Sequence, residues 1–151
     1  MAGPLRDRWA GLPAWARWVL AVYVVGFVDG AGAHIRWMLH GGIHAYAAAY
    51  PQVEIQVLFV SLIVLDPLAA LLTGLVRREG VWLACAIMVA DVIANWAGNW
   101  TRIATTQSRL LDSAFWLITA FGVFVLATAV PLVQVMGRHD APGPTSASQA
   151  A

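Results

Sequence analysis

Four long apolar stretches constrain this chain more than any other feature. They cover residues 15–35, 55–76, 81–100 and 113–136, and each is long enough, or nearly so, for a helix that crosses a bilayer. The chain is 60% hydrophobic and only 11% charged, whereas soluble domains carry about 25% charged residues. The sequence lacks the short segments of alternating apolar and polar residues that a β-barrel needs. We therefore predict an all-α integral membrane protein, a bundle of four transmembrane helices.

The arginines predict how these helices are oriented. Six of them lie in the N-terminal region, the connection between the second and third stretches, and the C-terminal tail; three lie in the other two connections. By the positive-inside rule both termini then face the cytoplasm, and we expect the cytoplasmic membrane of a bacterium. Residues 1–14 form a cytoplasmic segment, residues 15–136 the transmembrane domain, and residues 137–151 a disordered cytoplasmic tail. The first stretch also resembles a signal peptide, but Asp29 and the flanking tryptophans favour a retained anchor.

Two aspartates lie near the middle of apolar stretches, Asp66 in the second and Asp91 in the third. Because only the short segment 77–80 separates these stretches, we predict an antiparallel hairpin that brings both carboxylates to similar depth. A charged group at that depth costs about 2.5–3.5 kcal/mol on insertion scales, so it marks a functional site by default. The hairpin is therefore expected to hold the polar centre of the protein.

Polar residues near these acids predict a hydrated cavity within the membrane. Pro67 leaves the carbonyl of Ile63 without its helical partner, so the helix should bend beside Asp66. Asn95 and Asn99 follow the second acid at helical spacing and extend one polar stripe toward the surface. Hydrogen bonding that serves packing alone is the alternative. The predicted ligand-binding residues are Asp66, Asp91, Asn95 and, as an accessory acid late in the first stretch, Asp29.

Residues 36–52 form the longest internal connection and predict a short helix at the membrane interface. His40 and His44 are one helical turn apart there, which is the spacing of two metal ligands on one face. Two residues make a weak metal signal, so we prefer a structural role for both and predict no metal and no cofactor. A haem held between transmembrane helices would need histidines that the other three stretches lack.

Several chemical classes are disfavoured by what the sequence lacks. It contains no Ser-His-Asp order, no phosphate-binding glycine loop and no CxxC motif, and Cys85 is the only cysteine. The net charge of +1 provides no basic surface for nucleic acid. These absences favour a binding or transport protein in contact with lipid over an enzyme.

Two short stretches, Phe27-Val28-Asp29 and Ile63-Val64-Leu65-Asp66-Pro67, are followed by a turn that carries Gly80 and Trp82. Over residues 1–100 the chain thereby resembles the EXPERA superfamily of four-helix proteins, which includes the sigma-2 receptor and emopamil-binding sterol isomerases. The resemblance implies a ligand cavity that opens to the bilayer. Ser61 stands where that family has a glutamate, so its isomerase activity is not carried over. A separate bacterial family of four-helix membrane proteins fits the same features.

Three functions remain open from the sequence. In the leading hypothesis the protein binds a lipid or a small lipophilic molecule, including a cationic one, in an acidic cavity. The second hypothesis is a small proton-coupled transporter that acts as an oligomer such as a homodimer. The third is a non-catalytic subunit of a larger membrane complex. The sequence names neither the ligand nor the oligomeric state.

Overall fold

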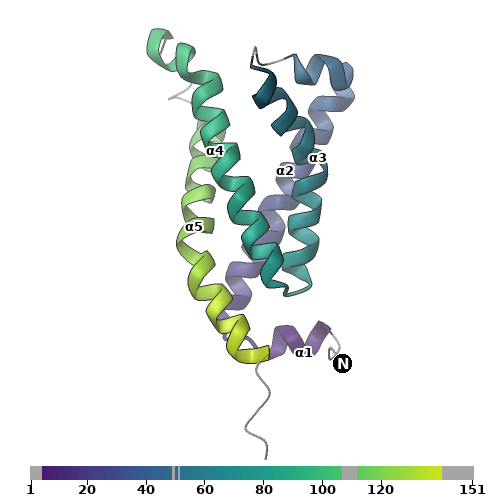
Figure 1. Ribbon diagram of the computed structural model, residues 1–151, viewed down its shortest axis with the longest axis vertical. Coiled ribbons are helices and arrows are strands. Elements are labelled where there is room, and N and C mark those ends of the chain that lie inside the picture. The colour runs from purple at the N-terminus through teal and green to yellow at the C-terminus, as the bar shows by residue number, and fades with distance from the viewer. Residues whose placement is uncertain (1–4, 49, 51, 107–111, 141–151) are drawn as a thin grey trace, which may run out of the picture.

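The computed structural model describes residues 5–48, 50, 52–106 and 112–140, and all regular structure within these ranges is helical. A short helix, α1 (Leu5–Ala10), precedes four long ones: α2 (Ala14–Ala47), α3 (Val53–Gly74), α4 (Arg78–Thr106) and α5 (Ser113–Asp140). The long helices run side by side, with α1 at one end of the bundle (Figure 1). All four are long and apolar enough to span a membrane, which confirms the expected all-α fold with four candidate transmembrane helices.

Helices α2 and α5 extend beyond the stretches expected from hydropathy. α2 begins directly after Pro13 and continues past residue 35 into the segment expected to lie at the interface. It does so because nothing in residues 34–41 breaks the backbone; the first non-helical residue is Gly42, with φ 75° and ψ 170°. α5 likewise extends four residues into the expected tail, and residues 141–151 of that tail lie outside the described part of the chain.

The predicted hairpin is formed by α3 and α4. The turn between them contains Val76 in the left-handed region, with φ 55°. Gly80 allows the two helices to pack closely, because a β-carbon there would lie 2.6 Å from the backbone nitrogen of Thr73. α1 lies at this end too, where Arg8 Nη1 and Trp9 Nε1 each donate a 2.9 Å hydrogen bond to a carbonyl oxygen near the end of α3. We call this the α1 end, and the other the opposite end.

Near the α1 end, a buried aromatic cluster joins α2 to α5. The Tyr23 hydroxyl donates to the Val125 carbonyl oxygen at 2.7 Å, and the Phe27 ring packs edge-on against the Phe121 ring at 5.5 Å. Gly26 makes room for this contact, because a β-carbon there would overlap the Phe121 ring. These residues hold α2 and α5 together over one half of their length.

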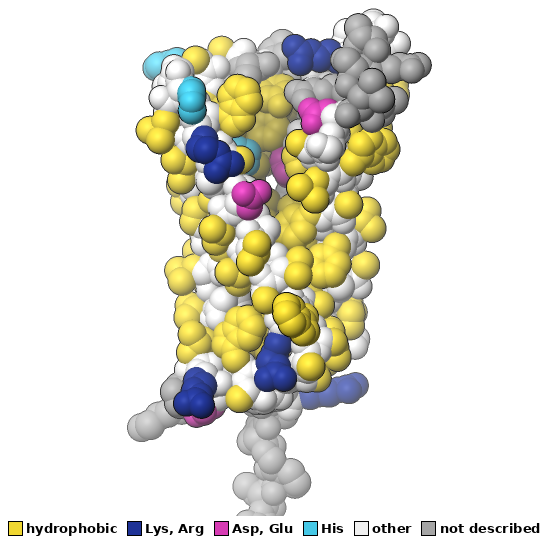
Figure 2. All heavy atoms as spheres, turned by 180° about the vertical axis from the view of Figure 1, so that it is seen from behind, with side chains coloured by type: hydrophobic (Ala, Val, Ile, Leu, Met, Phe, Trp, Pro, Cys, Tyr) yellow, Lys and Arg dark blue, Asp and Glu magenta, His cyan; other side chains and the backbone are white. Residues whose placement is uncertain are grey.

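Beyond Phe27 and Phe121, toward the opposite end, α2 and α5 diverge. The surface is hollowed between them there, and histidine and acidic side chains lie in and around the hollow (Figure 2). Between α3 and α4, the Tyr50 ring and the Ile55 side chain lie against Gly98 of α4. We call the hollow beyond Phe27 and Phe121 the α2–α5 opening. It leaves one side of the bundle open at about the depth of the predicted polar centre.

Candidate functional site

Asp66 lies on the face of α3 that packs against α2, and only 4% of its surface is exposed. Gly30 of α2 allows this packing, because a β-carbon at that position would lie 2.8 Å from Asp66 Oδ2. Pro67 follows inside α3, which runs as one continuous helix, and its missing N–H frees a carbonyl one turn earlier. The carboxylate is thus held between two helices at mid-length rather than facing outward.

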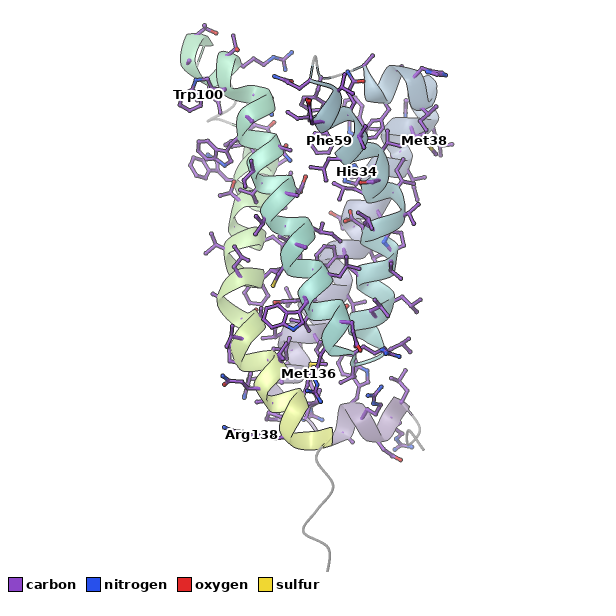
Figure 3. All side chains as sticks on the ribbon, viewed as in Figure 1. His34, Met38, Phe59, Trp100, Met136 and Arg138 are labelled. Atoms are coloured by element: carbon purple, nitrogen blue, oxygen red, sulfur yellow. The ribbon has the colours of Figure 1, made fainter. Side chains whose placement is uncertain are left out.

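His34 of α2 lies against Asp66. Its Nε2 atom lies 3.6 Å from Asp66 Oδ2, and only 16% of the His34 side chain is exposed. The rings of Phe59 and Tyr46 flank the imidazole, with centroids 6.1 and 6.0 Å away. Figure 3 places His34 and Phe59 at the end of the bundle remote from Met136 and Arg138. An imidazole and a carboxyl group therefore face each other in largely apolar surroundings.

Tyr46 reaches this pair because α2 folds back at Gly42. Twelve residues of straight helix would separate Tyr46 from His34 by about 18 Å along the axis. After the break, however, the Tyr46 hydroxyl forms a hydrogen bond with His34 Nδ1 and donates to the Phe59 carbonyl oxygen at 3.3 Å. Figure 1 shows the last turn of α2 bent away from the rest of the helix. The break thus adds a phenol to the carboxyl–imidazole pair.

Asp91 and Asn95 of α4 complete the polar cluster. Asn95 Nδ2 donates to Asp91 Oδ1 at 3.0 Å, so this part of the predicted stripe is joined within one helix. Asn99 continues the stripe by donating to the Asn95 carbonyl oxygen at 2.8 Å. Asp91 is close enough to Asp66 and Tyr46 for its charge to act on both. The structure therefore brings Asp66, Asp91 and Asn95 into one neighbourhood.

Asp29 does not join this cluster. Its side chain is exposed on α2, and within the described ranges it forms no hydrogen bond or ion pair. Gly30, the next residue, faces Asp66, so Asp29 is turned away from the acid that it was expected to assist.

His40 and His44 do not share a helical face. Their spacing would align them on a continuous helix, but Gly42 breaks the helix between them. His40 Nδ1 is bonded to the Arg36 carbonyl oxygen at 2.7 Å, and both histidines are exposed. Among the residues that the structure describes, no three His, Cys, Asp or Glu side chains are grouped to hold a metal ion.

Sequence reasoning missed His34 and Tyr46. The signal for His34 was its register: Tyr23, Phe27, Ala31 and His34 recur at helical spacing, and the first three are buried. Tyr46 offered no such signal, because its position depends on the backbone break. With both residues included, the candidate site is a carboxyl–imidazole–phenol chain beside a second carboxylate, and we call these four residues with Asn95 the acid cluster.

Two surface grooves lie away from the acid cluster. One of about 460 Å³ is lined by the end of α2 and the start of α3, and its lining residues are Ile43, His44, Gln56, Val57, Val60 and Ser61. The other, of about 330 Å³, lies where α1 meets α2 and includes Trp9, Arg17 and Trp18. Neither groove is lined by Asp66 or Asp91. The α2–α5 opening is a third hollow of the surface, with histidine and acidic side chains in and around it (Figure 2).

The chain was also compared with known proteins. No protein-family model matches it, and no curated protein or solved structure resembles it closely enough to count as a match.

Proposed function

We propose that the protein is a multi-pass protein of the bacterial cytoplasmic membrane with both termini in the cytoplasm. Four helices of sufficient length and apolarity support insertion. Basic side chains are concentrated at the α1 end, which also carries the α3–α4 turn and the end of α5 (Figure 2). The positive-inside rule then makes the α1 end cytoplasmic. The acid cluster consequently lies in the half of the bundle nearer the external side.

Within this membrane we propose that the protein binds a lipophilic molecule that carries a cationic group. The main support for this proposal is that Asp66 is buried near Asp91, at the level where α2 and α5 diverge. Two carboxylates close together in apolar surroundings repel each other and are poorly solvated, so a cation between them is strongly favoured. Asn95 orients the Asp91 carboxylate. The apolar part of such a ligand fits the α2–α5 opening, which faces lipid.

Binding of tetraphenylphosphonium, a lipophilic cation that does not form micelles, tests this proposal. Titration calorimetry on the protein in mild detergent should show saturable binding to the wild type. Asp66→Asn and Asp91→Asn should each weaken binding at least tenfold, which corresponds to about 1.4 kcal/mol. Asp7→Asn, the same change at an exposed position of α1, is the matched control and should bind like the wild type. Equal affinity in all four proteins would refute the proposal.

Proton-coupled transport is the second candidate, and the contact between His34 and Asp66 favours it. An exchanger must bind a proton and a cation alternately at one acid, and an imidazole beside that acid provides a route for the proton. In proteoliposomes, an imposed pH gradient should then drive tetraphenylphosphonium or ethidium across the membrane. Binding of the cation without its uptake would contradict transport and would support the binding proposal alone.

Membership of the EXPERA superfamily remains a proposal as well. An Asp-Pro pair inside α3, a helix that can span the membrane, supports it, whereas Asp29 lies near the middle of α2 rather than late in that helix. The acid cluster carries the binding proposal independently, because His34, Tyr46 and Asp91 are not part of the quoted resemblance. The two proposals can therefore fail separately.

A further inference from the structure

The hydrogen bonds of Tyr46 determine which nitrogen of His34 carries a proton. A phenol has a single hydrogen to donate, and Tyr46 gives it to the Phe59 carbonyl oxygen, which can only accept. The bond between the Tyr46 oxygen and His34 Nδ1 must then be donated by the imidazole. His34 is therefore protonated on Nδ1, and its Nε2 atom is the one that faces Asp66.

This assignment requires a proton on one of the two facing atoms, His34 Nε2 or Asp66 Oδ2. With Nδ1 protonated, a neutral imidazole directs the lone pair of Nε2 toward Asp66 Oδ2, 3.6 Å away. A lone pair and an ionised carboxylate repel each other at that separation, so one of the two groups must be protonated. A neutral acid beside a neutral imidazole costs less to bury than an ion pair does, since neither member loses the hydration of a charge. The proton therefore belongs on Asp66.

We propose that Asp66, His34 and Tyr46 form a proton-loading site whose proton is exchanged for the cationic ligand. This inference rests on the proposed function and defines the ion that occupies Asp66 when the ligand is absent. In the loaded state Asp66 is neutral, His34 carries a proton on Nδ1, and Tyr46 donates to the Phe59 carbonyl oxygen. In the released state Asp66 is a carboxylate, and the cluster holds one proton less.

Release follows the chain of contacts and balances at each atom. Asp66 Oδ2 gives its proton to His34 Nε2, which leaves a carboxylate and an imidazolium. The imidazolium then loses the Nδ1 proton to water that enters through the α2–α5 opening. The Tyr46 hydroxyl turns from the Phe59 carbonyl oxygen to donate to the bare Nδ1 atom. His34 now carries its proton on Nε2, where it donates to the Asp66 carboxylate that receives the cation.

The remaining charged neighbours favour this exchange. On α4, Asp91 is the titratable group that acts on Asp66, and Asn95 stabilises its ionised form by donating to Oδ1. An ionised Asp91 opposes a second negative charge on Asp66 and so keeps the proton there until a cation arrives. α3 contributes Asp66 itself, α2 contributes His34 and Tyr46, and the sequence of α5 has no titratable side chain before Arg138. The cation thus compensates the charge that proton release creates.

Nitrogen-15 NMR of histidine-labelled protein tests the loaded state without any ligand. The two ring nitrogens differ in chemical shift according to which one is protonated. His34→Gln identifies the His34 signals, and His40→Gln, at an exposed position of the same helix, is the matched control. Near neutral pH we expect His34 to be protonated on Nδ1 and to switch to Nε2 as the pH rises. Protonation on Nε2 throughout would overturn the proposal.

The Asp66→Asn variant tests whether Asp66 holds the proton. The asparagine amide donates a hydrogen to Nε2 as the protonated acid does, but it cannot release it. His34 should therefore stay protonated on Nδ1 at every pH that the folded protein tolerates. A variant that still switches like the wild type would show that Asp66 does not hold the proton. The wild-type spectrum decides the question by itself should the variant fail to fold.

Proton release on addition of tetraphenylphosphonium tests the exchange. In weakly buffered solution we expect about one proton to be released for each cation bound while His34 is protonated on Nδ1, and none above the pH at which it has switched to Nε2. Binding without proton release below that pH would overturn the exchange. Absence of binding, together with His34 protonated on Nδ1, would refute the proposed cation site and leave the proton-loading site supported.

Discussion

Gly30 of α2 lies directly against the carboxylate of Asp66 on α3, so that a β-carbon at Gly30 would come within 2.8 Å of Oδ2. Gly30 has helical backbone angles, so the small size of its side chain matters here and its conformational freedom does not. A hydrogen in place of a methyl group lets α2 cover the acid and lets His34, one turn later, face it. One small residue thereby sets the geometry of the carboxyl–imidazole pair.

Gly30→Ala should accordingly disturb the acid cluster. The added methyl group must displace Asp66 or separate α2 from α3, and overpacking of this kind costs about 1–3 kcal/mol of unfolding free energy. Tetraphenylphosphonium affinity should fall with it. Unfolding by SDS in mixed micelles measures the first effect, and calorimetry measures the second.

Gly32→Ala is the matched control for this experiment. Its nearest contact would be the end of the flexible Arg36 side chain at 3.4 Å, which can move away. The change should be neutral or should stabilise the helix by up to about 1 kcal/mol, because alanine is the better helix former. Equal losses in both variants would contradict the role assigned to Gly30.

The fold could be predicted largely from the sequence, because a bilayer admits few solutions for long apolar stretches. The hairpin followed from the short connection at residues 77–80, and the proximity of Asp66 and Asp91 followed from their positions along the helices. Helix ends were less accessible to prediction. Hydropathy falls after residue 35, but a helix ends only where the backbone is broken or capped, and in α2 that happens at Gly42.

Tyr23 should stabilise the bundle without contributing to the acid cluster. Its buried hydroxyl donates to the Val125 carbonyl oxygen at 2.7 Å and lies 3.0 Å from Thr128 Oγ1. Tyr23→Phe should lower the unfolding free energy by about 0.6–1.5 kcal/mol and leave cation affinity unchanged. A double-mutant cycle with Thr128→Val measures how much of this loss belongs to the pair. Additive losses would assign the effect to the Val125 bond.

Trp9 should fix α1 to the bundle. Its indole nitrogen donates to the Gly74 carbonyl oxygen at 2.9 Å, next to the Arg8 bond to Leu75, at a helix end that carries a partial negative charge. Trp9→Phe keeps the ring and removes the donor. Backbone amide exchange in α1 should accelerate several-fold, while α3 and α5 stay protected. Arg6→Gln, an exposed change in the same helix, should leave exchange unchanged, and equal acceleration in both would show that Trp9 is no anchor.

The composition of the acid cluster was only partly predictable. Asp66, Asp91 and Asn95 could be found because polar side chains stand out within apolar helices. His34 lies at the last turn of the first apolar stretch, where an interfacial position is expected, although its register follows that of the buried Tyr23 and Phe27. Tyr46 depends on a single backbone conformation at Gly42, eight residues after His34, and composition and spacing do not encode such a fold-back.

That conformation gives the last prediction, at Gly42. With φ 75° and ψ 170°, Gly42 occupies a backbone region that is essentially restricted to glycine, and a side chain there costs about 1–3 kcal/mol. Gly42→Ala should relieve this strain by continuing the helix, which moves Tyr46 away from His34. The Nδ1 signal of His34 should then lose the shift caused by its hydrogen bond, and its response to pH should change. Gly32→Ala places the same substitution in regular helix and should leave the His34 signals as they are. If His34 in the Gly42 variant titrates as in the wild type, Tyr46 does not depend on the break for its place in the acid cluster.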